Sequence, residues 1–270
     1  MENRLKKYLQ IAKMVWYESF TYRLNFIVWQ LRSFLLLLGG YFFWYAVYRF
    51  NNQIGVYDEK LMLTYVLLSS FLQSLILTSR SFQIAEDIAT GRLNNRLIKP
   101  ISYLKSMFSL DLGVKAASIF FLFFQLALIF IVLKPPFFVQ KDPLQLLSFI
   151  LVSFGGLFIY FYLSSLISLV TFWYPEDYGW PARFLFMVVN NFLSGGVLPL
   201  DILPVPIFNF LRFLPSANFI FFPLQVYLGK VNPSQLFHGF LMILFWIIVL
   251  KIITDFTWKK GLKNYTAVGI

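Results

Sequence analysis

Few residue types in this chain could carry out covalent chemistry. The sequence has no cysteine and one histidine, His238, and a lone histidine builds neither a histidine-based metal site nor a catalytic pair. Its one Gly-Lys pair, Gly229-Lys230, lacks the upstream glycine of the phosphate-binding loop G-x-x-x-x-G-K-S/T. ATP hydrolysis by that route is excluded, and we predict no catalytic residue, no metal site and no cofactor in this chain.

Polar residues gather instead in one run, residues 80–102, which we call the polar loop. Apolar segments at 61–79 and 116–133 flank it, so we expect it to connect two membrane spans. Four of its charges are basic and two are acidic, which places it on the cytoplasmic side of the membrane. The charged residues are Arg80, Glu86, Asp87, Arg92, Arg96 and Lys99.

The polar loop is also expected to fold into two short amphipathic helices. Apolar residues recur four apart on each side of Gly91, which is suited to the left-handed residue that ends a helix, and Pro100 ends the second face. A solvated connector is the alternative, but a connector needs only a few residues and no apolar stripe. The four apolar residues are Ile84, Ile88, Leu93 and Leu97.

The composition predicts an all-α integral membrane protein. Of the 270 residues, 59% are hydrophobic and 13% are charged, and the mean hydropathy is +0.70, which leaves too little polar surface for a soluble domain. The net charge of +11 alone could suggest a nucleic-acid partner. Most lysines and arginines, however, fall in the segments that we place in the cytoplasm, which is a topology signal. No nucleic-acid partner is expected.

We expect a single transmembrane domain over residues 1–270, embedded in the lipid bilayer with both termini in the cytoplasm. Residues 1–20 carry apolar residues at helical spacing beside lysines, which is typical of an interfacial helix. Residues 255–270 are expected to form a basic cytoplasmic tail. The six spans are expected at residues 24–48, 61–79, 116–133, 144–172, 183–196 and 235–254.

Charged residues near these spans are expected at the span ends. The second span is expected to continue as a helix to Glu86. Asp111 and Lys115, four residues apart, are expected to pair on one helical face and to mark the cytoplasmic start of the third span, near the membrane interface. Arg32 lies about a third of the way into the first span, where it either reaches the inner headgroups or pairs with a buried carboxylate or anion.

Residues 197–228, which we call the proline tract, are too apolar for a free outer loop. Five prolines forbid one continuous helix, so we expect outer half-helices that re-enter the membrane between spans five and six. The start of the tract and the glycine pair before it form a candidate outer gate. The gate residues are Gly195, Gly196, Pro199, Pro204 and Pro215.

Three stretches, in this order, resemble ABC-2 type permeases, the membrane domains of one class of ABC transporter. They are E-D-I-A-x-G-x-L-x-x-x-L-x-K-P-I-S in the polar loop, L-S-G-G-V-L-P-L-D-I-L-P at the start of the proline tract, and W-K-K-G-L-K-N-Y-T-A-V-G near the C-terminus. The last is similar to the tail of a compact branch whose members consist of the membrane domain without a fused ATPase. The resemblance covers nearly the whole chain.

The resemblance implies a permease subunit that exports its substrate across the cell inner or plasma membrane. Two permeases, identical or related, would assemble with two copies of a separate ATPase subunit, which would hold ATP and Mg. The polar loop would be the coupling helix that sits in a groove of that ATPase, with its apolar residues docking and its acids facing basic groups. The implied coupling residues are Ile84, Glu86, Asp87, Ile88, Gly91, Leu93, Leu97 and Pro100.

Little charge lies deep in the predicted spans, whereas aromatic residues make up 21% of the chain. We therefore expect a hydrophobic or amphipathic substrate, although lipid-facing packing accounts for most of the aromatic residues. The candidates for the substrate path are Gln125, Asn190 and Asn191, and the two asparagines either touch substrate or cap a neighbouring helix.

A membrane-embedded enzyme or scaffold acting on lipids is the alternative class. An enzyme would be expected to gather polar residues at one membrane face, and the sequence contains no such cluster. Co-purification of an ATPase from native membranes would separate the two classes.

Overall fold

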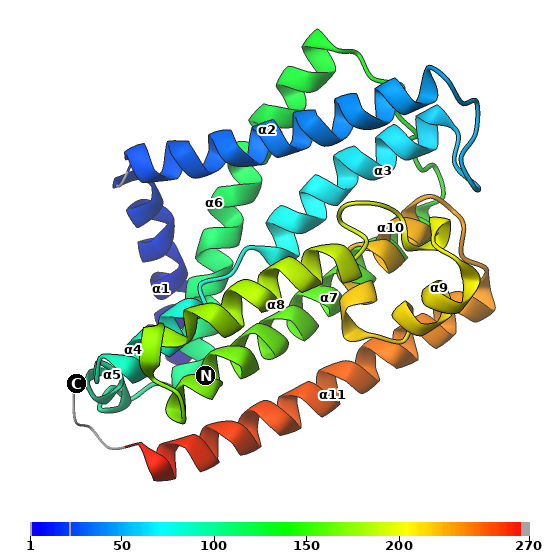
Figure 1. Ribbon diagram of the computed structural model, residues 1–270. Helices are drawn as coiled ribbons and strands as arrows, with labels where there is room; N and C mark the ends of the chain where they lie inside the picture. The colour runs from blue at the N-terminus through cyan, green and yellow to red at the C-terminus, as the bar shows by residue number, and fades with distance from the viewer. Residues whose placement is uncertain (1, 22, 266–270) are drawn as a thin grey trace.

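The computed structural model describes residues 2–21 and 23–265, and within these ranges the chain is helical and forms no strand (Figure 1). The long helices are α1 (Glu2–Thr21), α2 (Arg23–Tyr48), α3 (Glu59–Leu72), α6 (Tyr103–Val132), α7 (Pro143–Leu169), α8 (Trp180–Leu193) and α11 (Pro233–Asn264). The short elements are η1 (Gln73–Leu77), α4 (Phe82–Ala89), α5 (Leu93–Leu97), η2 (Val170–Phe172), η3 (Glu176–Gly179), η4 (Leu200–Ile202), α9 (Val205–Leu211), η5 (Pro215–Asn218) and α10 (Phe221–Tyr227).

Five helical segments are long and apolar enough to cross a membrane, or six if the pair 205–211 and 215–227, bent by 80°, counts as one span. The expected fifth span, 183–196, corresponds to α8, which has 14 residues, fewer than the ~20 that a bilayer needs. Six spans therefore stay a prediction. The five segments are Ile27–Tyr48, Glu59–Ala89, Tyr103–Val132, Pro143–Phe172 and Pro233–Asn264.

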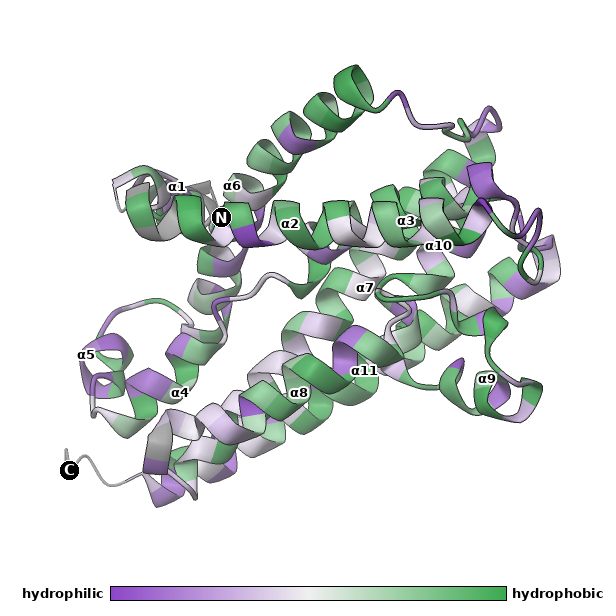
Figure 2. Ribbon diagram, turned by 45° about the horizontal axis from the view of Figure 1, so that its top comes forward, coloured by the Kyte–Doolittle hydropathy of each residue, from purple (hydrophilic) through white to green (hydrophobic). Residues whose placement is uncertain are grey.

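The long helices present apolar side chains on their outer surfaces. In the most apolar window of α11 only 11% of the residues are buried, and in that of α2 only 17%. In agreement with these low buried fractions, Phe123 on α6 and Phe245 on α11 are 60% and 54% exposed. Figure 2 shows hydrophobic residues along α2 and α6, and hydrophilic residues around α5 and in the connecting loops. Apolar surface of this extent belongs in lipid or against another subunit.

The molecule has two ends, which are formed by different short elements (Figure 1). We call the end with α4 and α5 the loop end, and the end with α9 and α10 the tract end. Three long helices begin at the tract end with side-chain caps: Asp58 and Asp142 accept hydrogen bonds from the first turns of α3 and α7, and Asn232 forms a capping box with Gln235 on α11. These caps satisfy backbone N–H groups that have no partner within the helix.

A separate apolar cluster packs the loop end. It joins α1, α4 and α5 to the first turns of α6 and to the end of α7, so the polar loop has a core of its own. Its buried members are Val15, Ile84, Ile88, Leu93, Tyr103, Met107, Leu110, Phe161, Leu169 and Phe172.

Two helix boundaries differ from the prediction. The helix of the second span does not continue to Glu86, because it ends in the π-helical turn η1 and residues 78–80 are not helical before α4 begins. α6, the helix of the expected third span, begins at Tyr103. Asp111 and Lys115 therefore lie about two or three turns inside it and not at its start. The earlier start has a physical reason, because Met107 in the added turns is buried in the loop-end cluster.

The two ends of the chain are partly described. The predicted interfacial helix at 1–20 coincides with α1, a single helix that packs along α6. The predicted tail at 255–270 begins as a continuation of α11, which runs to Asn264, and residues 266–270 lie outside the described residues.

A glycine permits the close crossing of α1 and α6. A Cβ atom at Gly113 would lie 2.5 Å from the backbone oxygen of Ala12 and 3.0 Å from Cβ of Val15. Contacts this short do not occur between a real Cβ atom and a carbonyl oxygen, so any other residue would push α1 away from α6.

We predict that Gly113→Ala destabilises the protein by roughly 1–3 kcal/mol, because overpacking at a tight crossing forces the backbone to shift. The free energy of unfolding in detergent and the rate of proteolysis within α1 would measure the effect. Gly39→Ala on α2 is the matched control, since nothing lies within 4 Å of a Cβ atom there. Equal stability of the two variants would contradict the prediction.

Candidate functional site

The polar loop folds as two short helices joined at a glycine, as predicted. α4 runs from Phe82 to Ala89 and is capped by Thr90, whose N–H bonds to the carbonyl oxygen of Glu86. Gly91 follows with φ of +73°, the left-handed conformation that favours glycine. The predicted left-handed conformation at Gly91 is therefore confirmed. α5 then extends over Leu93–Leu97.

The apolar side chains of the polar loop point mainly into the chain itself. Ile84 and Leu93 are 0% exposed and Ile88 is 5% exposed, which corrects the expectation that they dock on another protein. They hold the loop to α1, α6 and α7 through the loop-end cluster. Leu97 and Ile98 are 42% and 83% exposed, and they present the apolar surface of the loop.

The two acids of the polar loop pair within the loop. Asp87 is fully buried, accepts a hydrogen bond from the hydroxyl of Tyr103 at 2.9 Å, and its Oδ2 lies 2.6 Å from Nε of Arg96. Glu86 is partly exposed and pairs with Arg92 at 2.5 Å. Asp87 thus fixes α4 to α5 and to the start of α6. We had expected its carboxylate to face outward, but it faces the interior of the chain.

A buried ion pair on α6 binds η1 and the residues that follow it. The ammonium of Lys115 donates to the carbonyl oxygens of Ile76, at 2.8 Å, and of Thr78, and it lies 3.4 Å from Oδ2 of Asp111. Oδ1 of Asp111 accepts the backbone N–H of Arg80 at 2.8 Å. Both side chains are almost fully buried, at 2% and 1% exposure. The pair therefore satisfies backbone groups that the π-helical turn and the break after it leave unpaired.

The same break is tied to α1. The guanidinium of Arg80 lies 2.9 Å from a carboxylate oxygen of Glu18, and the backbone N–H of Ser102 donates to the hydroxyl of Tyr8 at 3.3 Å. One helix therefore contacts the polar loop at its first and at its last residues.

A third set of polar contacts joins the break to α7 and α8. Arg183 on α8 donates to the hydroxyl oxygen of Ser81 at 2.9 Å and to that of Ser168 at 2.6 Å. The hydroxyl of Ser81 also bonds to that of Ser164 on α7. We call residues 76–81 the junction. It contacts α1, α6, α7 and α8 through polar side chains, and it is the candidate functional site.

Sequence reasoning found part of this site. Asp111 and Lys115 carried a signal, since opposite charges four residues apart are unusual within an apolar run, but the pair was placed at the membrane interface. Ser164, Ser168 and Arg183 were not predicted, because they come from distant elements and nothing in their own segments marks them.

Two of the three predicted substrate-path residues bind other parts of the chain. The amide of Gln125 donates to the side-chain and backbone oxygens of Gln30 on α2, both at 3.1 Å. Asn190 is buried and accepts a hydrogen bond from the hydroxyl of Ser216 at 2.6 Å, so it links α8 to η5. Asn190 thus contacts a neighbouring element without capping it, Asn191 is exposed, and a role of either residue in the substrate path stays a prediction.

The two glycines of the predicted gate lie where the proline tract meets α3 and η1. The carbonyl oxygen of Gly195 accepts a hydrogen bond from the hydroxyl of Tyr65 at 2.7 Å, and that of Gly196 accepts one from the amide of Gln73 at 3.3 Å. The prolines begin the short helices of the tract. Pro199 precedes η4, Pro204 precedes α9 and Pro215 opens η5.

A polar cluster that the sequence analysis missed holds the tract end, and we call it the Asp201 cluster. The carboxylate of Asp201 accepts hydrogen bonds from the hydroxyl of Tyr57 at 2.9 and 3.0 Å and from the amide of Gln225 at 3.2 Å. The ammonium of Lys230 lies 3.2 Å from the ring centroid of Tyr57 and donates to the backbone oxygen of Val56. The cluster joins the loop before α3 to η4 and α10.

Within the part of the chain that the structure describes, no three histidine, cysteine or acidic residues lie together as metal ligands would. Helices long and apolar enough to span a bilayer, joined to a folded polar loop, define a multi-pass membrane protein.

A family model described as an ABC-2 family transporter protein matches residues 34–269. The chain therefore belongs to the ABC-2 transporter family, and it is the membrane component of an ABC transporter, a class that works with an ABC ATPase. The predicted resemblance is confirmed. A comparison with curated proteins found no match.

We predict that Lys115→Met destabilises the protein by about 3–5 kcal/mol, because it leaves Asp111 buried without its partner and two carbonyl groups without donors. Lys251→Met is the control, since Lys251 and Asp255 form an exposed pair of the same four-residue spacing, and solvent screening leaves such pairs little effect on stability. Unfolding free energies in detergent would compare them, and similar small losses would contradict a structural role for the buried pair.

In the Asp201 cluster, we predict that Asp201→Ala costs about 1–3 kcal/mol, because the Tyr57 hydroxyl loses its acceptor and the Gln225 amide loses one of its two acceptors. Tyr57→Phe should cost less. The double variant should cost less than the sum of the two single variants, since one hydrogen bond is removed by both. Thermal unfolding of the four proteins gives the cycle, and strictly additive losses would exclude direct coupling between the two side chains.

Proposed function

We propose that this chain is one permease of an ABC exporter whose separate ATPase drives it through the polar loop. The observation that carries the proposal is the junction. A loop that only connected spans would not need buried polar contacts to four helices, whereas a loop that transmits force needs them. ATP and Mg would lie on the ATPase, of which two copies would serve two permeases.

The ATPase would contact the exposed surface of the polar loop, and the buried face would hold the loop to its spans. Leu97, Ile98 and Lys99 are exposed on α5 and just after it, and Pro100 follows. Glu86, partly exposed and paired with Arg92, would meet basic groups of the ATPase at the edge of this surface. Gly91 would set the angle between the two helices.

The second permease, identical or related, would pack against the exposed apolar surface of α2 and α8. On α2, Leu35 and Phe43 are 59% and 60% exposed, and on α8 Leu185 and Phe192 are 64% and 59% exposed. Two permeases would enclose a transport path more readily than one small bundle. Both termini would face the cytoplasm, and the proline tract would re-enter the inner or plasma membrane from the outside.

The substrate would be a hydrophobic or amphipathic molecule that is exported. The described Asp111–Lys115 pair is neutralised within the chain, so it offers no fixed charge to a polyanion. Asn191 is the exposed polar residue near the start of the proline tract, and we assign it to the path. Gln125 and Asn190 would border the path as positioning residues, because their side chains are already paired.

We predict that Ile98→Glu abolishes co-purification of the ATPase, because it places a charge in the centre of the proposed apolar contact. Loss of a central contact is worth ~2 kcal/mol or more, roughly a thirtyfold loss of affinity. The ATPase that elutes with affinity-tagged permease from native membranes would be quantified.

Phe50→Glu is the matched control, since Phe50 is 88% exposed at the tract end and should retain the ATPase. Gly91→Val provides a second variant: a β-branched residue is disfavoured at positive φ, so coupling between ATP hydrolysis and transport should fall even where the ATPase still binds. Full ATPase retention by Ile98→Glu, with stimulated hydrolysis intact in Gly91→Val, would overturn the assignment.

A further inference from the structure

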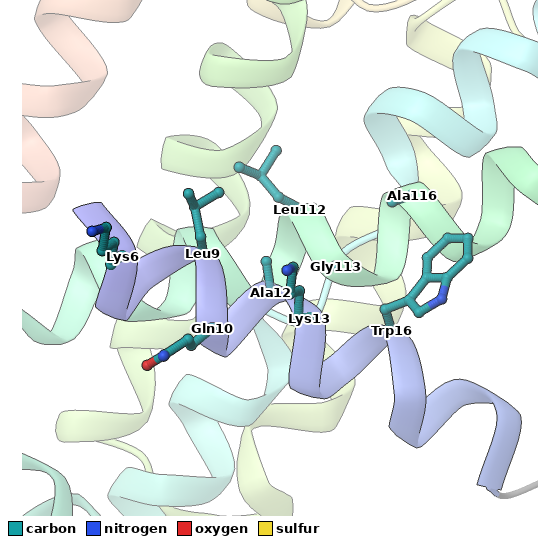
Figure 3. Close-up of a pocket in the computed structure, with 9 residues that line it drawn as sticks. All are labelled: Lys6, Leu9, Gln10, Ala12, Lys13, Trp16, Leu112, Gly113 and Ala116. Atoms are coloured by element: carbon teal, nitrogen blue, oxygen red, sulfur yellow. The ribbon is translucent and has the colours of Figure 1, made fainter. Parts of the chain in front are cut away.

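An open groove of about 560 Å³ runs between α1 and α6, beside the Gly113 crossing. Figure 3 shows side chains of α1 along one wall and Leu112, Gly113 and Ala116 of α6 along the other. Its volume lies within the ~300–1,000 Å³ of ligand pockets in proteins.

The groove combines apolar walls with two lysines. Leu9 and Leu112 are 55% and 39% exposed and contribute apolar wall, and Trp16 lies at the end near Ala116. Lys6 and Lys13 line the same groove from α1, about two helical turns apart and so on one face of that helix. An occupant that complements both features has an apolar part and a negatively charged group.

The surroundings of the groove decide the kind of occupant. The wall on α6 continues into exposed Phe120, Phe123 and Phe124, on a helix that is long and apolar enough to span a bilayer. This surface belongs in hydrocarbon, whereas the basic face of α1 belongs at the level of the headgroups. A soluble partner cannot reach the first surface, but a phospholipid reaches both.

We propose that the α1–α6 groove binds an anionic phospholipid, with an acyl chain along α6 and its phosphate between Lys6 and Lys13. The headgroup of a zwitterionic lipid also carries a positively charged ammonium group, which the same two lysines repel. The site therefore favours anionic over zwitterionic lipids. Because α1 also bonds to the polar loop through Tyr8 and Glu18, a bound lipid steadies the helix that supports the loop. The site is independent of the substrate and of the ATPase.

The test compares lipid retention and stability of the purified full chain. Nanodiscs of phosphatidylcholine, with and without phosphatidylglycerol, serve for thermal unfolding, and native mass spectrometry counts the phosphatidylglycerol that stays bound. The double variant Lys6→Gln/Lys13→Gln should bind phosphatidylglycerol roughly thirtyfold more weakly, from two lysines near the membrane surface, and should lose the stabilisation that phosphatidylglycerol gives.

Two further variants separate a site from general charge. Lys259→Gln/Lys260→Gln removes two exposed lysines from the end of α11 and should leave retention unchanged. Ala116→Trp keeps every charge but fills the groove, and it should weaken retention as the lysine variant does.

Equal loss in both lysine pairs, or no preference for phosphatidylglycerol over phosphatidylcholine, overturns the proposal. A change in permease copy number with lipid retention intact also overturns it, because the groove would then be a protein interface.

Discussion

The structure depends on one constraint, the need to satisfy backbone groups where the helix formed by α3 and η1 breaks. A break among buried residues leaves carbonyl and N–H groups without helical partners and out of reach of water, so other groups of the chain must pair them. Lys115 supplies N–H donors to Ile76 and Thr78, and Asp111 accepts the N–H of Arg80. A buried ammonium is tolerated because the carboxylate and the two carbonyl groups together replace its hydration. The pair therefore fixes the backbone just before the polar loop, and the contacts of Arg80 and Ser81 fix the first residues of the loop itself.

The contacts on the two sides of the polar loop differ in kind. On its buried side, apolar packing around Ile84 and Leu93 resists sliding, because interlocked side chains have few alternative arrangements. At the junction, the hydrogen bonds donated by Lys115 and Arg183 and the ion pair of Arg80 with the Glu18 carboxylate hold the chain, and such polar contacts can exchange partners. Under the proposed coupling, the junction lies between the tightly packed loop-end cluster and the long helices. A force on the polar loop would therefore reach the helices through the polar contacts of the junction.

Local spacing predicted the local features of the site. The two short helices and the positive φ of Gly91 follow from residues within one segment, and the sequence showed them. The break after η1 could not be predicted, because residues 73–81 contain neither glycine nor proline, and its cause lies on α6. Likewise, periodicity showed that Asp111 and Lys115 share a face, but not which element covers that face. Ile84 was expected to contact the ATPase and is instead buried in the loop-end cluster. The reason is the same, because an apolar stripe on a helix does not show whether it packs on its own chain or on another protein.

The helix α3 with η1 links the two ends of the molecule. On one side Tyr65 and Gln73 hold the carbonyl groups of Gly195 and Gly196 in front of the proline tract, and just beyond them Ile76 and Thr78 receive Lys115. The contacts to the tract and those to the junction are thus separated by little more than the π-helical turn. A π turn holds one extra residue relative to an α-helix, and its return to α-helix would shift the register of everything after it. Under the proposed coupling, a displacement of the polar loop that travels along this segment would either be absorbed in η1 or reach the glycine pair.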